Sequence, residues 1–213
     1  MLKRTIDIVV SAIALTMLSP LMVVVAFLVR IFMGSPVLFV QPRPGCQGRT
    51  FDLYKFRTMK NANGSDGKPL ADHERMSRLG NFLRRFSLDE FPQLWNVLKG
   101  DMSLVGPRPL LVEYLERYTP EQARRHEVRP GITGLAQVSG RNSLPWEERF
   151  KLDVHYVDHK NLVLDLDILM KTALKLIRPE GINQQGHAIG GDMFMGSSTH
   201  GRNARRADVE KAA

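Results

Sequence analysis

The sequence contains only one cysteine, Cys46, among its 213 residues. A single thiol excludes an intramolecular disulfide and any zinc site built from cysteines, and it is typical of a protein in a reducing compartment. Extremes of composition are missing too, because hydrophobic residues make up 43% and charged residues 24% of the chain. These fractions exclude wholesale disorder and collagen-like or other low-complexity architectures. At this length we expect one main domain that buries a core of its own.

Acidic residues are scarce relative to basic ones: 22 Asp and Glu face 30 Lys and Arg, and the formal net charge is +8. This surplus favours an anionic partner, which composition leaves open as nucleic acid, a nucleotide or an anionic membrane surface. No helix-turn-helix or RNP-type pattern is visible. A membrane-tethered nucleic-acid-binding protein and a non-catalytic membrane scaffold are therefore the alternatives to an enzyme that acts on an anionic substrate.

Charged residues are absent between Asp7 and Arg30. The apolar run 8–29 would form a helix about 33 Å long at about 1.5 Å per residue, which matches a hydrocarbon core of about 30 Å. The run is longer than the apolar part of a signal peptide, about 7 to 15 residues, and no small-residue cleavage site follows it. A buried core helix is disfavoured because the run is apolar on all sides. We therefore predict a membrane segment.

Ser19 and Pro20 lie near the middle of this segment. Pro20 cannot donate a hydrogen bond to the carbonyl of Thr16, and its ring crowds the preceding turn, so we expect a kink there. We expect the Ser19 hydroxyl to bond back to the carbonyl of Leu15. Basic residues flank both ends of the segment, which suggests that both ends are cytoplasmic. The residues alone leave two alternatives: a re-entrant helix that returns to the same side, and a kinked single span.

After the membrane segment the pattern predicts a mainly helical α+β body. Two β-prone runs joined by a turn rich in Pro and Gly predict a small β-hairpin unit. Apolar periodicity predicts several surface amphipathic helices, and we expect the last of them to lie on the membrane surface. The predicted strands are 36–39 and 50–57, and the predicted helices are 73–85, 91–98, 111–126, 145–159 and 162–177.

The residues that carry chemistry gather after position 83. Asp89 and Glu90 are adjacent and follow Arg84 and Arg85 closely. Such a carboxylate pair suits Mg²⁺, and guanidinium groups bind phosphate oxygens in pairs. A carboxylate can also attack phosphorus as a nucleophile. The structural alternative is a capping box, in which Ser87 and Glu90 close the start of a helix.

Two other patterns favour structural explanations. Asp165 and Asp167 form a DxD pattern like that of metal-dependent glycosyltransferases, but they lie in the first turn of a predicted helix, where acidic side chains complement the helix dipole. His155 and His159 share one helical face, but the Glu of a metalloprotease motif does not follow the first of them. We expect these four residues to be structural or solvated.

Three segments together resemble the bacterial sugar transferase family, the monotopic phosphoglycosyl transferases. They are KFRTM at 55–59, SLDEFPQLWNVLKGDMSLVGPRP at 87–109 and RPGITGLAQVSGRN at 129–142. The resemblance extends over about residues 3–177. The chain is most similar to the short members, which have no additional multi-span region before the membrane segment.

The resemblance implies transfer of a sugar 1-phosphate from a UDP-sugar to polyprenyl (undecaprenyl) phosphate, with release of UMP, as the first membrane step of glycoconjugate biosynthesis. It implies that Asp89 is the nucleophile that forms an aspartyl phospho-sugar intermediate, and that Glu90 helps to bind Mg²⁺ or orients the reacting groups. It also implies a re-entrant helix broken at Ser19 and Pro20. By position, the substrate-binding residues would be Lys55, Arg57, Arg84, Pro107, Arg108, Pro109, Arg129 and Arg141.

We accordingly expect a re-entrant membrane helix at 1–33, a catalytic domain at 34–180 on the cytoplasmic face of the bacterial inner membrane, and a poorly ordered C-terminal tail at 181–213, which is rich in Gly, Ser, Asn and Arg. The expected partners are the UDP-sugar, polyprenyl phosphate and membrane lipids, without nucleic acid. The oligomeric state, the pathway and the sugar stay open among diacetylbacillosamine, GalNAc, GlcNAc, glucose and galactose. The resemblance to the short members, in the region of Glu113, Tyr114 and Arg117, implies an N-acetylated amino sugar, with or without further modification.

Overall fold

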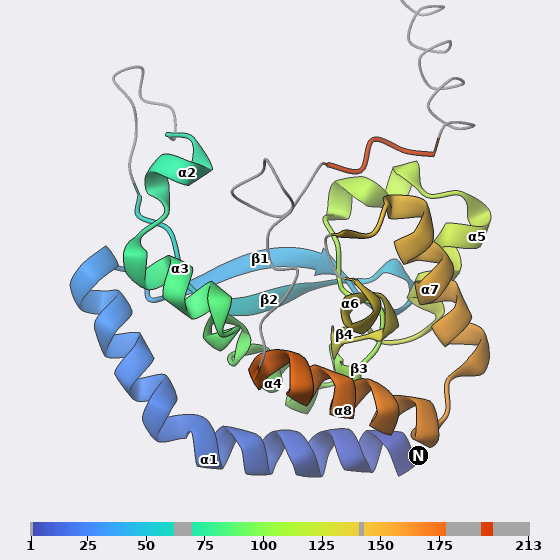
Figure 1. The fold of residues 1–213 in the computed structure, drawn as a ribbon, viewed down its shortest axis with the longest axis horizontal. Coiled ribbons are helices and arrows are strands. Elements are labelled where there is room, and N and C mark those ends of the chain that lie inside the picture. The colour runs from blue at the N-terminus through green and yellow to red at the C-terminus, as the bar shows by residue number, and fades with distance from the viewer. Residues whose placement is uncertain (1, 62–69, 141–142, 178–192, 198–213) are drawn as a thin grey trace, which may run out of the picture.

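The computed structural model describes residues 2–61, 70–140, 143–177 and 193–197. Within these residues the fold is mainly helical, with a two-stranded antiparallel sheet and a two-stranded parallel one. A long N-terminal helix runs along one side of a body made of the hairpin and shorter helices (Figure 1). The predicted α+β class, with a small β-hairpin unit, is confirmed.

The long helix α1 spans Leu2–Met33, and the hairpin strands are β1 (Leu38–Pro44) and β2 (Thr50–Phe56), joined through a 3₁₀ turn, η1 (Cys46–Gly48). The rest are α2 (Asp72–Arg75), α3 (Arg78–Arg85), the 3₁₀ turn η2 (Leu88–Glu90), α4 (Gln93–Lys99), β3 (Ser103–Val105), η3 (Val112–Arg117), α5 (Pro120–Ala123), η4 (Arg124–Glu127), β4 (Gly131–Thr133), α6 (Leu135–Ser139), α7 (Trp146–His159) and α8 (Leu162–Ile177).

Helix α1 is bent, and Figure 1 shows two legs that meet at an angle. Pro20 lies inside the helix. The carbonyl that Pro20 leaves without its usual donor is that of Thr16, and the Ser19 hydroxyl donates to it at 2.8 Å. The prediction that Ser19 would bond to Leu15 is therefore wrong by one residue, because the hydroxyl serves the carbonyl that the proline vacates.

The outer surface of α1 is apolar. Side chains along both legs, including Met17, Val23 and Phe27, are more than half exposed. The helix is long and apolar enough to cross a membrane. Exposure of this much apolar surface to water is unfavourable, so contact with lipid accounts for it better than solvent does.

Charged side chains at the start of α1 bind the first leg to the body. Lys3 forms an ion pair with the buried Asp165 of α8 at 2.6 Å. Arg4 donates to two main-chain carbonyls at the C-terminal end of α4, and the buried Asp7 carboxylate accepts a hydrogen bond from β3. The first Asp of the DxD pattern thus anchors the membrane helix.

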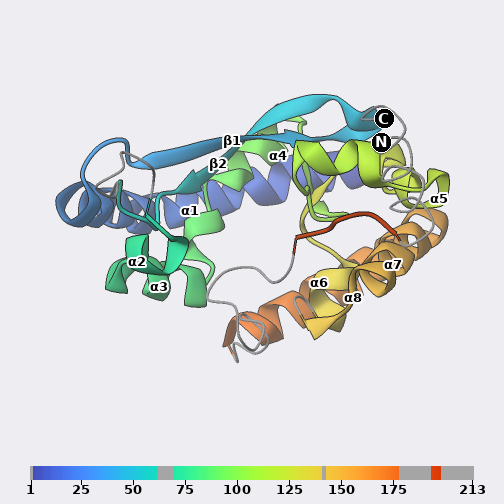
Figure 2. The same ribbon diagram turned by 90° about the horizontal axis from the view of Figure 1, so that it is seen from above.

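The two legs of α1 also pack against different parts of the core. Along the first leg, Leu15 and Leu18 contact a cluster formed mainly by α4, β3, α7 and α8. On the second leg, Val25 and Val29 are buried against β2 and α3. Both legs are therefore attached to the same body, which also appears in the view from above (Figure 2).

Helix α8 has the boundaries predicted from its periodicity, and it is amphipathic. Its buried face includes Asp165 and Ile168, whereas Val163, Leu166 and Met170 form an exposed apolar stripe. The predicted long helix at 111–126 is wrong. Thr119 and Gln122 form a capping box that starts α5 at Pro120, so the chain forms three short turns instead.

Five residues of the segment expected to be poorly ordered, 193–197, make defined contacts with the body. Phe194 is buried among the rings of Tyr114, Tyr118 and Phe150. Its main-chain NH donates to the Tyr114 hydroxyl at 3.1 Å, and its carbonyl accepts from Arg117 at 2.6 Å. The rest of the predicted tail lies outside the described residues.

Candidate active site

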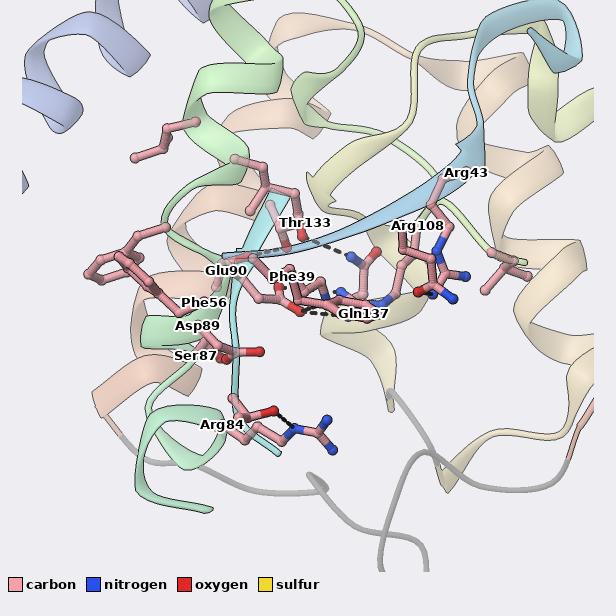
Figure 3. Close-up of a pocket in the computed structure, with 18 of the residues that line it drawn as sticks. Phe39, Arg43, Phe56, Arg84, Ser87, Asp89, Glu90, Arg108, Thr133 and Gln137 are labelled. Carbon is pink, nitrogen blue, oxygen red and sulfur yellow. Dashed lines mark hydrogen bonds and ion pairs between the residues drawn. The ribbon is translucent and has the colours of Figure 1, made fainter. Parts of the chain in front are cut away.

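A large cavity of about 1200 Å³ opens between the hairpin, the α3–η2 segment and the helices α6 and α7. Its walls include Lys55, Arg57, Arg84, Asp89, Glu90 and Arg108, which come from separate segments of the sequence. Figure 3 shows these walls in close-up. Six of the predicted site residues therefore come together at one cavity.

The acidic pair enters the cavity because the chain turns sharply between α3 and α4. Ser87 has a φ of 55°, in the left-handed region, and a single 3₁₀ turn follows before Pro92 precedes α4. The Ser87 side chain makes no capping hydrogen bond, and the Glu90 side chain is used elsewhere. The capping-box alternative is therefore wrong, because the left-handed residue directs the two acidic side chains away from the helix start.

Glu90 is held between two cations. Its Oε1 accepts from Lys55 Nζ at 2.9 Å and from Arg108 Nη2 at 2.6 Å, and Arg108 Nη1 lies 3.4 Å from Oε2. Burial alone would raise the pKa of Glu90, but Arg108 and Lys55 hold that pKa well below its usual range. Glu90 is therefore ionised, and its oxygens are engaged by protein donors.

Asp89 has the opposite environment. Its residue is 7% exposed, and within the described part of the chain its carboxylate takes part in no hydrogen bond or ion pair. Burial, and then the neighbouring Glu90 charge, raise the pKa of Asp89, although Lys55, Arg84 and Arg108 oppose the rise. Two adjacent carboxyl groups with pKa values shifted in opposite directions are typical of catalytic pairs. The Asp89 oxygens are available to a substrate.

Cationic side chains lie on two sides of Asp89. Arg84 Nε donates to Thr58 Oγ1 at 3.0 Å on one side, and Arg108 and Arg43 extend from the other (Figure 3). Arginine side chains bind phosphate oxygens through paired N–H donors. A cavity of this size with cations on both sides of a carboxylate suits an extended phosphate-containing ligand.

The prolines of the PRP motif surround Arg108 and remove main-chain donors beside it. The flanking main chain is fixed instead by β4, because Gly131 N donates to the Pro107 carbonyl at 3.0 Å. Pro107 and Pro109 line a small pocket behind the cavity and do not line the cavity itself. Their role is thus to set the position of Arg108.

Other predicted binding residues have structural positions. Arg57 lines the cavity, but it is 5% exposed and donates to the carbonyls of Met33 and Ser35, so it secures the end of α1. Arg129 is exposed, donates to the Gly100 carbonyl at 2.8 Å and does not line the cavity. Arg141 lies outside the described residues.

Sequence reasoning missed several arginines at the cavity wall, including Arg43, Arg125 and Arg149. Arg43 belongs to β1, Arg125 is 3% exposed and pairs with Asp153 at 2.7 Å, and Arg149 lies 4.5 Å from the centre of the Trp146 ring. For Arg43, its position on the same hairpin as Lys55 was an available signal. Arg125 and Arg149 had none, because only the tertiary fold brings them to the cavity.

A divalent cation fits this site only if the protein and a bound phosphate ligand coordinate it together. The described residues contain no cluster of three or more His, Cys, Asp or Glu side chains that could hold a metal. Both Glu90 oxygens are engaged by cations, which leaves the Asp89 carboxylate as the protein ligand. Mg²⁺ usually binds one or two carboxylates together with substrate phosphates. The residues fit Mg²⁺ held between Asp89 and a phosphate ligand, and they do not favour the expected ligation by Glu90.

Comparison with known proteins identifies relatives along nearly the whole chain. The sequence model of bacterial sugar transferases matches residues 1–179. The chain is 50% identical over 196 residues to the uncharacterized sugar transferase EpsL of Bacillus subtilis, covering 92% of this chain and 96% of EpsL. It is 42% identical over 197 residues to the undecaprenyl-phosphate galactose phosphotransferase of Salmonella typhimurium, covering 84% of this chain and 41% of that protein. It is 38% identical over 187 residues to the UDP-glucose:undecaprenyl-phosphate glucose-1-phosphate transferase of Caulobacter vibrioides, covering 82% and 69%.

Proposed function

The chain belongs to the bacterial sugar transferase family, and on this basis we propose that it moves a sugar 1-phosphate from a UDP-sugar to polyprenyl phosphate and releases UMP. The relatives named as undecaprenyl-phosphate sugar phosphotransferases support this reaction class. The observation that carries the proposal is the buried Asp89 carboxylate, without a protein partner among the described residues, between Arg84 and Arg108. The family matches give no support to the nucleic-acid-binding alternative.

The first step forms a bond between an Asp89 oxygen and the phosphorus that carries the sugar. The bond from this phosphorus to the bridging oxygen breaks, and UMP leaves with the electron pair. In the second step an oxygen of polyprenyl phosphate attacks the same phosphorus, the bond to Asp89 breaks, and the carboxylate is restored. Each step exchanges one P–O bond for another, so the chemistry needs no redox partner.

The cationic residues position the phosphates and neutralise charge. Glu90 holds the Lys55 ammonium and the Arg108 guanidinium at the cavity wall through charge-assisted hydrogen bonds. Arg84 contributes a guanidinium from the α3 side. Mg²⁺ bound by Asp89 and the diphosphate would neutralise negative charge on the phosphate oxygens. Positioning and electrostatic stabilisation together account for catalysis of phosphoryl transfer.

We further propose that α1 is re-entrant and does not cross the bilayer. The first leg is bound to the body through Lys3, Arg4 and Asp7, and the other end is bound through Arg57. A straight spanning helix would carry Lys3, Arg4 and Asp7 to the side of the membrane opposite the body. The bend at Pro20 removes this conflict and supports a helix that enters and leaves by the same face.

The body would then lie on the cytoplasmic face of the bacterial inner membrane, because basic residues flank both ends of the apolar run. The exposed stripe of α8 supports contact of the body with lipid. This arrangement brings a water-soluble donor and a membrane-bound acceptor to the same cavity.

The reaction is tested with the full chain in lipid nanodiscs that contain undecaprenyl phosphate and Mg²⁺. UMP release is measured for UDP-diacetylbacillosamine, UDP-GalNAc, UDP-GlcNAc, UDP-glucose and UDP-galactose. We expect release with at least one donor, dependent on the lipid acceptor over many turnovers, and loss of release in Asp89→Asn. Absence of release with every donor, or full release by Asp89→Asn, would overturn the proposal.

A further inference from the structure

Arg43 lies at the wall of the cavity beside Arg108. It is the sixth residue of β1 and pairs across the hairpin with Phe51. The two guanidinium groups approach each other at the end of the site away from Arg84 (Figure 3). The positive charge of Arg108 contributes to lowering the pKa of Arg43, which reflects this proximity. The fold has therefore brought two like charges together at one place.

The two arginines differ in their partners. Arg108 is balanced by Glu90 at 2.6 Å. Arg43 donates from Nη2 to the neutral Gln41 Oε1 at 2.7 Å, and it has no ion pair with any carboxylate in the described part of the chain. Its Nε is buried without a hydrogen-bond partner among these residues. A buried donor without a partner is unfavourable until an acceptor such as an anion approaches.

Arg43 remains a cation at neutral pH. Burial, and then the neighbouring Arg108 charge, lower its pKa to about 10, which is still far above 7. Around Asp89 and Glu90 the cavity thus presents the cations Lys55, Arg84, Arg108 and Arg43. The residues that line the cavity include more Lys and Arg than Asp and Glu, and this positive surplus suits the two negative charges of a diphosphate diester.

The direction of the reaction decides which phosphate lies at this end. In phosphoryl transfer the attacking and leaving oxygens lie roughly in line on opposite sides of phosphorus. With the sugar-bearing phosphorus placed between Asp89 and the Arg108 and Arg43 pair, at the end of the site away from Arg84, the leaving oxygen faces these two guanidinium groups.

We propose that Arg43, together with Arg108, binds the nucleotide phosphate of the donor and stabilises it as it leaves as UMP. This inference rests on the proposed transferase function. The leaving phosphate gains one negative charge when the bridging bond breaks, so a second guanidinium gains importance in the transition state. This charge develops on UMP only when the bridging bond breaks in the first step, so Arg43 acts mainly in that step.

The test compares Arg43→Gln with Arg49→Gln, which removes an exposed arginine from the same hairpin. UMP binding to the full chain in nanodiscs is measured by isothermal titration calorimetry. We expect Arg43→Gln to weaken UMP binding about tenfold to a hundredfold, the loss of one or two hydrogen bonds to a charged group, and Arg49→Gln to change it less than about twofold. Arg43→Lys should restore part of the affinity.

Single-turnover kinetics separate the two steps. The rate of UMP formation without acceptor should fall in Arg43→Gln, whereas discharge of the preformed intermediate by undecaprenyl phosphate should keep the wild-type rate. Wild-type UMP affinity and a wild-type first step in Arg43→Gln would overturn the inference, even if its melting temperature falls. If Arg43→Gln does not fold, UMP affinity and the rate of the first step are measured on Arg43→Lys, and wild-type values of both would overturn the inference.

The inference and the proposed function fail separately. UMP release by the wild type with unchanged UMP affinity in Arg43→Gln contradicts only the role of Arg43. Absence of UMP release from every UDP-sugar contradicts the function, and loss of UMP affinity in Arg43→Gln would still support the phosphate site.

Discussion

Arg125 donates from Nη2 to the main-chain carbonyl of Arg108 at 2.8 Å. The same guanidinium pairs with the buried Asp153 at 2.7 Å and lies against the rings of Tyr118 and Phe150. Arg108 stands between two prolines, so this side-chain bond fixes the main chain that carries the Arg108 guanidinium at the cavity wall. We infer that Arg125 is a positioning residue for Arg108.

A paired substitution separates this positioning role from a stabilising one. Arg125→Met alone should destabilise the protein by about 3–5 kcal/mol, because it leaves the Asp153 charge buried and unpaired. The double variant Arg125→Met with Asp153→Leu replaces the ion pair by apolar groups and should recover most of the melting temperature. We expect UMP release by the double variant to stay low, mainly through kcat. A stable double variant with wild-type kcat would disprove the positioning role.

Glu90→Gln should change the pH dependence of the reaction. Burial lowers the pKa of Lys55, and the Glu90 charge opposes that decrease. Without the Glu90 charge the Lys55 pKa falls further, so the loss of activity on the alkaline side should begin at a lower pH. We also expect at least about a tenfold loss at neutral pH, from a broken charge-assisted hydrogen bond.

The pH profile of UMP release checks this prediction. Lys55→Arg is the control, because a guanidinium does not titrate in the accessible range. Its profile should lack the alkaline limb that Lys55 causes. An alkaline limb at the same pH in wild type and Glu90→Gln would show that the two side chains are not coupled.

His126 should make stability depend on pH. Burial, and then the Arg125 charge, lower the pKa of His126 from 6.5 to about 4. Between these values the unfolded chain binds a proton that the folded protein excludes. The free energy of unfolding is therefore unaffected by His126 above about pH 6.5. It decreases by up to roughly 3 kcal/mol as the pH falls toward 4.

Thermal unfolding of wild type and His126→Asn measures this contribution. His126 Nδ1 lies 3.3 Å from the Gly45 carbonyl, and an asparagine amide can still donate to that oxygen without titrating. We expect a flatter profile for the variant between pH 4 and 6.5. Parallel profiles would assign the acid sensitivity to other groups.

Membrane topology is tested by labelling single cysteines in oriented vesicles. In a Cys46→Ser background, cysteines placed at Leu2 and Ser35 flank the two ends of α1. The contacts of Lys3 and Arg57 with the body predict that an impermeant maleimide labels both from the same side. A cysteine at Met17, near the bend, should be protected by lipid. Labelling of the two ends from opposite sides would establish a spanning helix instead.

The sequence allowed the acidic pair and its cations to be predicted, since Lys55, Asp89, Glu90 and Arg108 all belong to motifs and meet at one cavity. Helix α8 was also predictable, because its apolar periodicity is uninterrupted. These successes share a cause: the signal is either local or carried by long motifs.

The wrong predictions concern side chains whose partners are set by tertiary contacts. Ser87 and Glu90 have capping-box spacing, but the left-handed Ser87 and two distant cations direct Glu90 elsewhere. Arg129 belongs to a family motif, yet it bonds to a loop carbonyl away from the cavity. The membrane helix was predicted from composition. Its attachment to the body through Lys3 could not be predicted, because the partner Asp165 is distant in the sequence.

The covalent role of Asp89 is the central claim, and intact-protein mass spectrometry tests it most directly. The full chain is incubated with an active UDP-sugar and Mg²⁺ without polyprenyl phosphate, beside Asp89→Asn and the exposed control Asp167→Asn. Asp89→Asn should melt no lower than wild type, because it removes a carboxylate that is buried without a protein partner among the described residues. We predict one added sugar phosphate on wild type and Asp167→Asn, none on Asp89→Asn, and loss of the adduct when acceptor is added. A wild-type enzyme that turns over without any adduct, or an equal adduct on Asp89→Asn, would contradict the account.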